Sequence, residues 1–378
     1  MIKTEIIAYG ESTFRGYNEL TGVEESSPVS YFTPSMLQNH LGGGLVVDVN
    51  NVAQTGVETS VQMASGSLTI INIASHKGML AIVNLGINDA YQGRTQTEFA
   101  SNFTAAIERL RRTGKLVHIQ TPNKVGVNVA YPDGTHSKNG LSFAAALNGM
   151  ASQIPGIASG KGCPCQGTGS QTVELTAAAH NNDATLSTHP DHNGYATMAS
   201  GLCLLVSLST VNIVKARLAV ALLYSAIFTR AVEKGGLDYW AGQITAGNVA
   251  FENGTCAAQL LPYSTYATTN DSGFVTAIYN NVFGRAPDSA GLSYWIGRLN
   301  AGDTRGLVIS TMLDIGYNYT GTDTSSITSQ RLIQNRASVA LAYGSIYQHI
   351  AVDGTGAASV LYSVTDAYST VSTATAGF

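Results

Sequence analysis

The chain has 378 residues, of which 12% are charged, and a formal net charge of -4 at neutral pH. This length predicts two or three compact domains, and the absence of a strong positive field argues against a nucleic acid partner. Four cysteines are too few for a disulfide framework in so long a chain, and we expect none of them to be catalytic. We find no apolar run that suggests a transmembrane segment and no evident signal peptide.

Short apolar runs alternate with segments of helical period in the first part of the chain, which is typical of a parallel sheet covered by helices. Four of these runs are predicted to be strands: Ile6–Tyr9, Leu45–Val47, Leu80–Val83 and Leu116–Ile119. We therefore expect residues 1–212 to form a three-layer α/β/α domain.

Two helices are predicted within this domain. Large apolar side chains recur at helical spacing between the last two strands: Phe99, Phe103, Ile107 and Leu110. Thr95 and Glu98 have the spacing of a capping box, and Gly114 stands where that helix is expected to end. A second helix is expected after Gly194, with three apolar residues on its buried face: Met198, Leu202 and Leu205.

Four polar segments follow strands or close the domain. Ser12 comes directly after the first predicted strand, Gly56 follows the second, and Asn88 follows the third. His189 stands near the end of the domain, in a segment that continues with Pro190 and reaches Gly194-Tyr195. Because the carboxyl ends of parallel strands meet at one edge of a sheet, we expect these segments to converge there.

In order and location these segments resemble the SGNH (GDSL-like) hydrolases, and the fold that this resemblance implies is a flavodoxin-like sheet. The resemblance implies Ser12 as the nucleophile and His189 as the general base. It also implies an oxyanion hole formed by the backbone N–H groups of Ser12 and Gly56 and the side-chain amide of Asn88. An imidazole titrates near neutral pH and is suited to deprotonating a serine. We expect no cofactor and no metal, because no cluster has metal-ligand spacing and no glycine-rich loop follows a strand.

The sequence departs from the family pattern at two positions. Glu11 precedes the nucleophile where the family usually has Asp, and Leu186 occupies the usual position of the acid partner of His189. Asp183 is the nearest upstream replacement, while a backbone carbonyl that holds the imidazole in a Ser-His dyad is the alternative. Two further residues of this segment are rival candidates for a place in the site: Asp191 and His192.

A repeat appears in the second half of the chain. Residues 223–247 align without gaps with residues 278–302, and the two tryptophans of the chain occupy equivalent positions in the two copies. Aromatic residues at repeated helical positions favour the packing core of paired helices over a ligand platform. We therefore expect a helical domain over residues 213–322.

Residues 323–378 are expected to form a separate C-terminal part. The polar stretch Gly321–Ser329 precedes a possible helix around Ala337–Ile350, and a tail rich in Ser, Thr and Ala follows. Such a tail is expected either to be disordered or to pair only within an oligomer.

The pattern from Phe283 to Trp295 resembles a helical repeat of unknown function found in bacterial surface and phage structural proteins. By this analogy we expect an esterase that removes O-acetyl groups from a cell-surface polysaccharide, located outside the cell or on a virion such as a phage tail. The expected partners are an acetylated glycan or a small ester, with assembly into a homo-oligomer or a virion. The alternatives are a general short-chain esterase, lipase or thioesterase, and a catalytically inactive glycan-binding or structural protein.

Overall fold

The computed structural model describes residues 5–15, 17, 18, 23, 24, 37, 40, 41, 48–167, 186–190, 192–347 and 355–378. The chain divides into two compact units, one made of residues 4–110 and 116–211 and the other mainly of residues 212–378. This division lies close to the domain boundary expected after residue 212. The separation of residues 213–322 from 323–378 stays a prediction.

The first unit contains a five-stranded sheet in which all neighbouring strands are parallel, in the order β4-β1-β5-β6-β7. Its strands are β1 (Glu5–Gly10), β4 (Asp48–Asn51), β5 (Leu80–Asn84), β6 (Leu116–Gln120) and β7 (Cys165–Gln166). A separate antiparallel pair joins β2 (Tyr17–Asn18) and β3 (Val23–Glu24). Three of the four predicted strands are confirmed, whereas Leu45–Val47 lies outside the described residues.

The strand order places a topological switch point at β1. The chain runs from β1 outward to β4 and then crosses back to β5 on the other side, which is the flavodoxin-like order. Ligands of open α/β sheets bind at the carboxyl ends of the strands beside such a point. In this chain, that position is the turn that follows Gly10.

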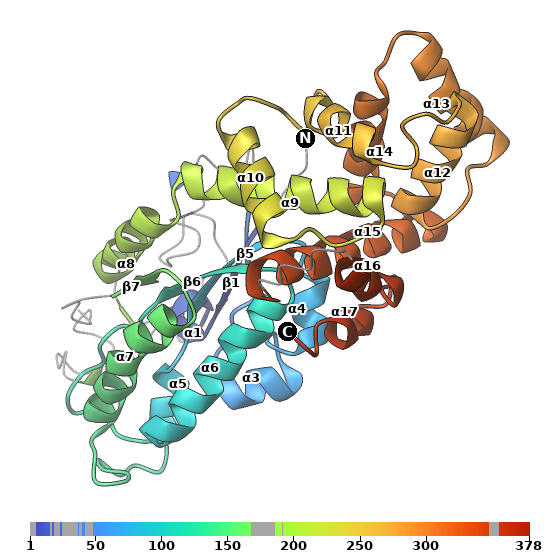
Figure 1. The fold of residues 1–378 in the computed structure, drawn as a ribbon. Helices are drawn as coiled ribbons and strands as arrows, with labels where there is room; N and C mark the ends of the chain where they lie inside the picture. The colour runs from blue at the N-terminus through green and yellow to red at the C-terminus, as the bar shows by residue number, and fades with distance from the viewer. Residues whose placement is uncertain are drawn as a thin grey trace. The chain divides into compact units, whose positions relative to one another are not determined.

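Helices cover both faces of the sheet, which confirms the three-layer α/β/α fold. The helices of this unit are α1 (Ser12–Arg15), α3 (Thr59–Ser65), α4 (Ile70–Ser75), α5 (Ile87–Tyr91), α6 (Gln96–Arg112), α7 (Phe143–Gly160) and α8 (His192–Leu205). Val117 and Ile119 of β6 belong to the hydrophobic cluster with α6 and α7, which lie side by side in Figure 1. Gln120 points to the opposite face, where its Nε2 donates to the carbonyl of Met198 in α8 at 2.7 Å.

Helix α6 confirms its sequence signals. All four residues of the predicted apolar face are fully buried: Phe99, Phe103, Ile107 and Leu110. The capping box forms as expected, because Thr95 Oγ1 accepts from the Glu98 N–H at 3.2 Å and Glu98 Oε2 accepts from the Thr95 N–H at 2.8 Å. In α8, Met198 and Leu202 are buried as predicted.

The second unit is helical, as expected. Its elements, with the first helix beginning just before the division, are α9 (Leu208–Phe228), α10 (Lys234–Thr245), α11 (Thr255–Leu260), η2 (Leu261–Tyr263), α12 (Asp271–Phe283), α13 (Ser289–Asn300), α14 (Arg305–Tyr317), α15 (Thr324–Ala342), η3 (Tyr343–Tyr347), α16 (Thr355–Tyr362) and α17 (Ser369–Ala374). Among the described helices, only α9 is long and apolar enough to cross a membrane, judged by length and composition alone. The mean hydropathy of its most apolar 18-residue stretch is 1.6, and 72% of that stretch is buried, as in the core helix of a globular domain.

The repeat forms two matching pairs of helices, the end of α9 with α10 and α12 with α13. Tyr224 and Tyr279 occupy equivalent buried positions, each with an arginine guanidinium over its ring, at 5.1 Å and 5.3 Å from the centroid. Trp295 is also buried. The expectation that the repeated aromatic residues form a packing core is wrong for Tyr239 and Tyr294, which are 58% and 53% exposed.

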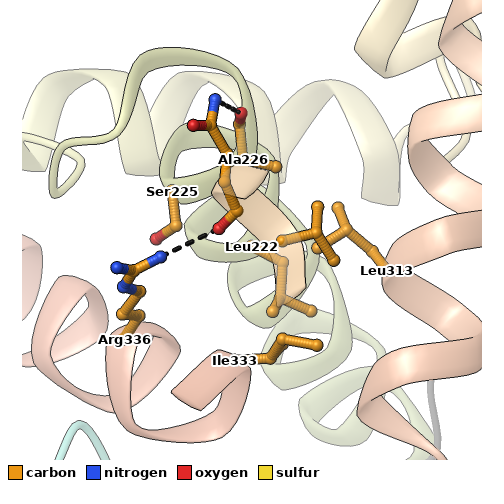
Figure 2. A pocket seen from close by; sticks show the side chains of 8 residues that line it. Leu222, Ser225, Ala226, Leu313, Ile333 and Arg336 are labelled. Atoms are coloured by element: carbon orange, nitrogen blue, oxygen red, sulfur yellow. Dashed lines mark hydrogen bonds between the residues drawn. The ribbon is translucent and has the colours of Figure 1, made fainter. Parts of the chain in front are cut away.

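Polar contacts cross the interior of this unit between α9, α12 and α15. The Arg336 Nη1 donates to the carbonyl of Asn281 at 2.8 Å, and Asn281 Nδ2 donates to the carbonyl of Ala226 at 2.8 Å. Figure 2 shows these bonds beside Ser225, around a cavity of about 10 Å³. Burial lowers the pKa of Arg336. A cavity of this size has room for about one water molecule, so it offers no ligand site.

Residues 355–378 of the C-terminal tail are folded, which corrects the expectation of disorder or of pairing only within an oligomer. Three apolar residues in and between α16 and α17 are buried: Leu361, Val364 and Val371. Helix α15 begins inside the predicted polar stretch, where the Asp323 carboxylate accepts from the Ser326 N–H at 2.8 Å and caps the helix. The predicted helix around Ala337–Ile350 is therefore the second half of a longer one, continued by η3, and residues 348–350 lie outside the described residues.

Candidate active site

Ser12 lies at the carboxyl end of β1, at the first position of α1. Gly10 permits a close approach here, because a Cβ there would lie 2.9 Å from the Asn84 carbonyl oxygen of the neighbouring strand and 2.9 Å from the Phe14 Cβ of α1. The chain leaves the sheet through Glu11 and enters the helix at once, so that Ser12 lies at the switch point. Ser12 is 4% exposed.

His189 meets Ser12 at this edge of the sheet. The distance between His189 Nε2 and Ser12 Oγ is 2.6 Å, a hydrogen bond between two predicted site residues. The ring of Tyr17 lies against the imidazole, with centroids 4.8 Å apart and the planes tilted by 45°. The Tyr195 hydroxyl in turn donates to the Tyr17 carbonyl at 3.2 Å, which fixes that segment against α8.

A pocket of about 260 Å³ opens above the pair. Its lining residues come from the segments that follow β1, β4 and β5 and from the segment that contains His189: Ser12, Tyr17, Thr55, Gly56, Ile87, Asn88, Tyr91, Thr188 and His189. The structure thus brings together four of the predicted site residues. The remaining one, Asp183, lies outside the described residues, and so does its rival Asp191.

Asn88 is held in the pocket by a carboxylate clamp from Glu11. Glu11 is fully buried, and its Oε1 accepts from the Gly86 N–H at 2.7 Å while its Oε2 accepts from the Asn88 N–H at 2.6 Å. Gly86 adopts a φ of 124°, which a residue with a side chain rarely tolerates. The residue before the nucleophile therefore fixes the turn that presents Asn88.

Burial, opposed by the hydrogen bonds of the clamp, sets the direction of the Glu11 pKa shift. Burial raises the pKa of Glu11, and the neighbouring carboxylate of Asp89 raises it further, while the N–H bonds from Gly86 and Asn88 oppose the shift.

Asp89 is a structural residue in this arrangement. Its Oδ2 accepts from the N–H and the hydroxyl of Thr59, at 3.1 Å and 2.7 Å, and so caps the first turn of α3.

Two contributors to the site were missed from the sequence. Tyr17 contacts the imidazole from a short strand, and the buried Asn123 lies in the loop after β6 and hydrogen-bonds to Thr13 and to the Thr188 carbonyl. Neither belongs to a motif, and only the position of Asn123 just beyond a predicted strand was a usable signal. Within the described part of the chain, no group of three or more His, Cys, Asp and Glu side chains has the arrangement of a metal site.

Two family models match parts of the chain. The model of the GDSL-like Lipase/Acylhydrolase family matches residues 8–197, which is half of the chain, and a domain of unknown function (DUF4214) matches residues 263–315. No curated protein matches the chain at a significant level.

Several solved structures align with about half of the chain. A member of the lipolytic protein G-D-S-L family from Veillonella parvula is 19% identical, with a TM-score of 0.38, over 54% of this chain and 97% of that one. An aryl esterase of M. smegmatis is 18% identical, with a TM-score of 0.42, over 53% and 97%. A carbohydrate acetylesterase family member from Sinorhizobium meliloti is 15% identical, with a TM-score of 0.37, over 53% and 96%. On the match to residues 8–197, the chain belongs to the GDSL-like lipase/acylhydrolase family.

Proposed function

We propose that the chain hydrolyses carboxylic esters with Ser12 as the nucleophile and His189 as the general base. The observation that carries this proposal is the 2.6 Å hydrogen bond between Ser12 Oγ and His189 Nε2, at the floor of a pocket that Asn88 and Gly56 also line. A serine becomes an effective nucleophile when an adjacent base removes its proton during attack. Family membership independently supports ester hydrolysis.

The reaction proceeds in two halves. Ser12 Oγ attacks the ester carbonyl while His189 takes its proton, and the negative charge moves to the carbonyl oxygen. The Asn88 amide and the backbone N–H groups of Gly56 and Ser12 stabilise this oxyanion. The alcohol leaves with the proton from His189, and an acyl-enzyme remains on Ser12. Water, deprotonated by His189, then attacks the acyl group. His189 returns the proton to Ser12 Oγ as the bond between Ser12 and the acyl group breaks, which releases the acid and the free serine.

We propose O-acetyl groups of a cell-surface polysaccharide as the substrate. The pocket of about 260 Å³ is smaller than most sites for drug-sized ligands, which favours a short acyl group. Its walls include two tyrosines and no Asp, Glu, Lys or Arg side chain, so that a neutral ester is accommodated more readily than an anionic one.

Two substrate series test this part of the proposal. Acetate release from an acetylated bacterial polysaccharide is measured beside hydrolysis of p-nitrophenyl esters of increasing chain length, with Ser12→Ala as the control. We expect acetate release and a sharp fall in rate beyond butyrate. Activity confined to long-chain esters would contradict it. Equal rates on all short esters, without acetate release from the polysaccharide, favour a general short-chain esterase.

Asp183 is the proposed acid partner of His189. In a triad, Asp183→Ala lowers kcat because the imidazole loses the carboxylate that stabilises its protonated form. In a dyad, the same substitution leaves kcat unchanged. The comparison of these kcat values with that of the unchanged protein separates the two arrangements.

We propose further that the enzyme acts outside the cell or as part of a virion. This proposal rests on the resemblance of the helical repeat to repeats of bacterial surface and phage structural proteins, together with the low fraction of charged residues, 12%. Antibody detection in culture supernatant, purified virions and cytosol tests it. A signal restricted to the cytosol counts against it.

A further inference from the structure

The side chain of Asn123 links the chain neighbours of both reacting groups. Asn123 lies in the loop after β6 and is 2% exposed. Its Oδ1 accepts from the Thr13 hydroxyl at 3.1 Å, and its Nδ2 donates to the Thr188 carbonyl at 3.0 Å. Thr13 directly follows Ser12, and Thr188 directly precedes His189, so one amide spans the two segments that must meet.

The loop holds the His189 segment at a second point. The Gly126 N–H donates to the Ser187 carbonyl at 2.6 Å, and Asn123 Nδ2 also donates to the Lys124 carbonyl at 2.9 Å. Both Thr13 and Ser187 are fully buried. The hydrogen bonds of a buried amide are strong constraints, because leaving either partner unsatisfied away from water costs free energy.

His189 depends on such constraints because residues 187–190 belong to no strand or helix. A strand residue is fixed by its ladder and a helix residue by its own turn, but here the backbone is held by the Asn123 side chain and by the Gly126 N–H. We propose that Asn123 is a positioning residue that sets the distance between Ser12 Oγ and His189 Nε2. This inference rests on the proposed function, since it assigns Asn123 a role in the same reaction.

The Thr13 hydroxyl allows a mild test of this role. Thr13→Val keeps the shape of the side chain but removes the hydroxyl group that donates to Asn123 Oδ1, whereas Thr13→Ser keeps that hydroxyl group. Asn123→Ala removes both bonds of the bridge. Displacement of reacting groups by about 1 Å costs on the order of 100-fold in rate. We expect kcat for p-nitrophenyl acetate to fall roughly 10- to 100-fold in Asn123→Ala and less in Thr13→Val, with KM nearly unchanged.

Gln120 provides the matched control. It is a buried amide on the adjoining strand that donates to the Met198 carbonyl of α8, away from the pocket. We expect Gln120→Ala to lower the Tm while leaving kcat near that of the unchanged protein. If Asn123→Ala lowers kcat only as much as Gln120→Ala does, Asn123 contributes stability alone and the proposal is overturned.

The remaining outcomes are also decisive. A kcat near that of the wild type in Thr13→Ser, together with a lowered kcat in Thr13→Val, supports the bridge even where Asn123→Ala fails to fold. An equal kcat in the two Thr13 variants overturns it. A second readout is the rate at which a fluorophosphonate labels Ser12, which must fall in the same order as kcat. If the wild-type protein shows neither esterase activity nor labelling, the proposed function is refuted, and this inference with it. Active protein with unaffected variants refutes only the role of Asn123.

Discussion

Ser12 and His189 are separated by 177 positions in the sequence, and their side chains meet at 2.6 Å. The Ser12 side of this contact is a turn at the end of a central strand, which a rigid sheet supports. The His189 side is an irregular segment held by hydrogen bonds and by the ring of Tyr17. Because the contact depends on both sides, substitutions of the residues around it are expected to change kcat and stability to different extents.

Asn88 is expected to act only when charge develops on the substrate. Asn88→Ala should lower kcat by about 100- to 1000-fold, because one fixed oxyanion donor is lost, while KM for p-nitrophenyl acetate changes little. Steady-state kinetics checks this. A rise in KM at constant kcat would assign Asn88 to substrate binding instead.

Glu11 should matter through the position of Asn88. In Glu11→Gln, an NH₂ group replaces one of the two acceptor oxygens and faces a backbone N–H, which pushes the Gly86 turn away from the pocket. We expect kcat to fall at least about 10-fold, consistent with the loss that displaced groups produce.

The control for Glu11 is Glu108→Gln, which changes a half-exposed carboxylate of α6 paired with Lys161. Its kcat should remain that of the unchanged protein, because surface ion pairs contribute at most about 1 kcal/mol. Equal activity in both variants would show that the clamp has no part in catalysis.

His118 should make the first domain sensitive to acid. Burial lowers the pKa of His118 to about 4, whereas the same group titrates at 6.5 when exposed. The unfolded chain therefore binds a proton at a higher pH than the folded one, and this contribution to the free energy of unfolding falls as the pH drops from 6.5 to 4. Relative to His118→Leu, the unchanged protein should lose about 3 kcal/mol over this window.

Denaturant unfolding at several pH values measures this difference. The comparison with His118→Leu is needed because the raised pKa of Glu11 acts in the opposite direction, lowering the free energy of unfolding as the pH rises above 4.5. Parallel pH profiles for the two proteins would show that His118 is not protonated on unfolding in this range.

Adjacent aromatic residues of the repeat should differ sharply in their contribution to stability. Trp295 is 5% exposed and Tyr294 is 53% exposed. Trp295→Ala should destabilise the second unit by about 3 to 5 kcal/mol, since it leaves a cavity in the core. Tyr294→Ala should change its stability by less than about 1 kcal/mol. Urea unfolding of the full chain checks both, and similar losses would contradict the assigned packing.

Regular features of the fold were predictable because they rest on local patterns. The helical period of Phe99 to Leu110 and the capping pair Thr95 and Glu98 specify α6 without knowledge of the rest of the molecule. The convergence of Ser12 and Asn88 followed from a general rule, that the carboxyl ends of parallel strands share an edge. The role of His189, which lies in no strand or helix, was expected from the resemblance to SGNH hydrolases.

The features that were missed depend on contacts between distant segments. Nothing in the neighbourhood of Asn123 distinguishes it from an ordinary loop asparagine until Thr13 and Thr188 are placed beside it. The exposure of Tyr294 likewise depends on which side of α13 meets the other helices. The folded tail was missed because small polar residues conceal three apolar positions that are buried only against the rest of the unit.

The proposed esterase is tested most directly by labelling and turnover in the same preparations. Fluorophosphonate labelling and hydrolysis of p-nitrophenyl acetate are measured for the unchanged protein, Ser12→Ala and His189→Ala, with mass spectrometry to locate the label. We predict a single label on Ser12 and a loss of kcat on the order of 10⁴- to 10⁶-fold in both variants. A wild-type protein that is neither labelled nor active would contradict the account and favour a protein that binds glycans without hydrolysing them. Activity that survives Ser12→Ala would contradict the role of Ser12 as the nucleophile.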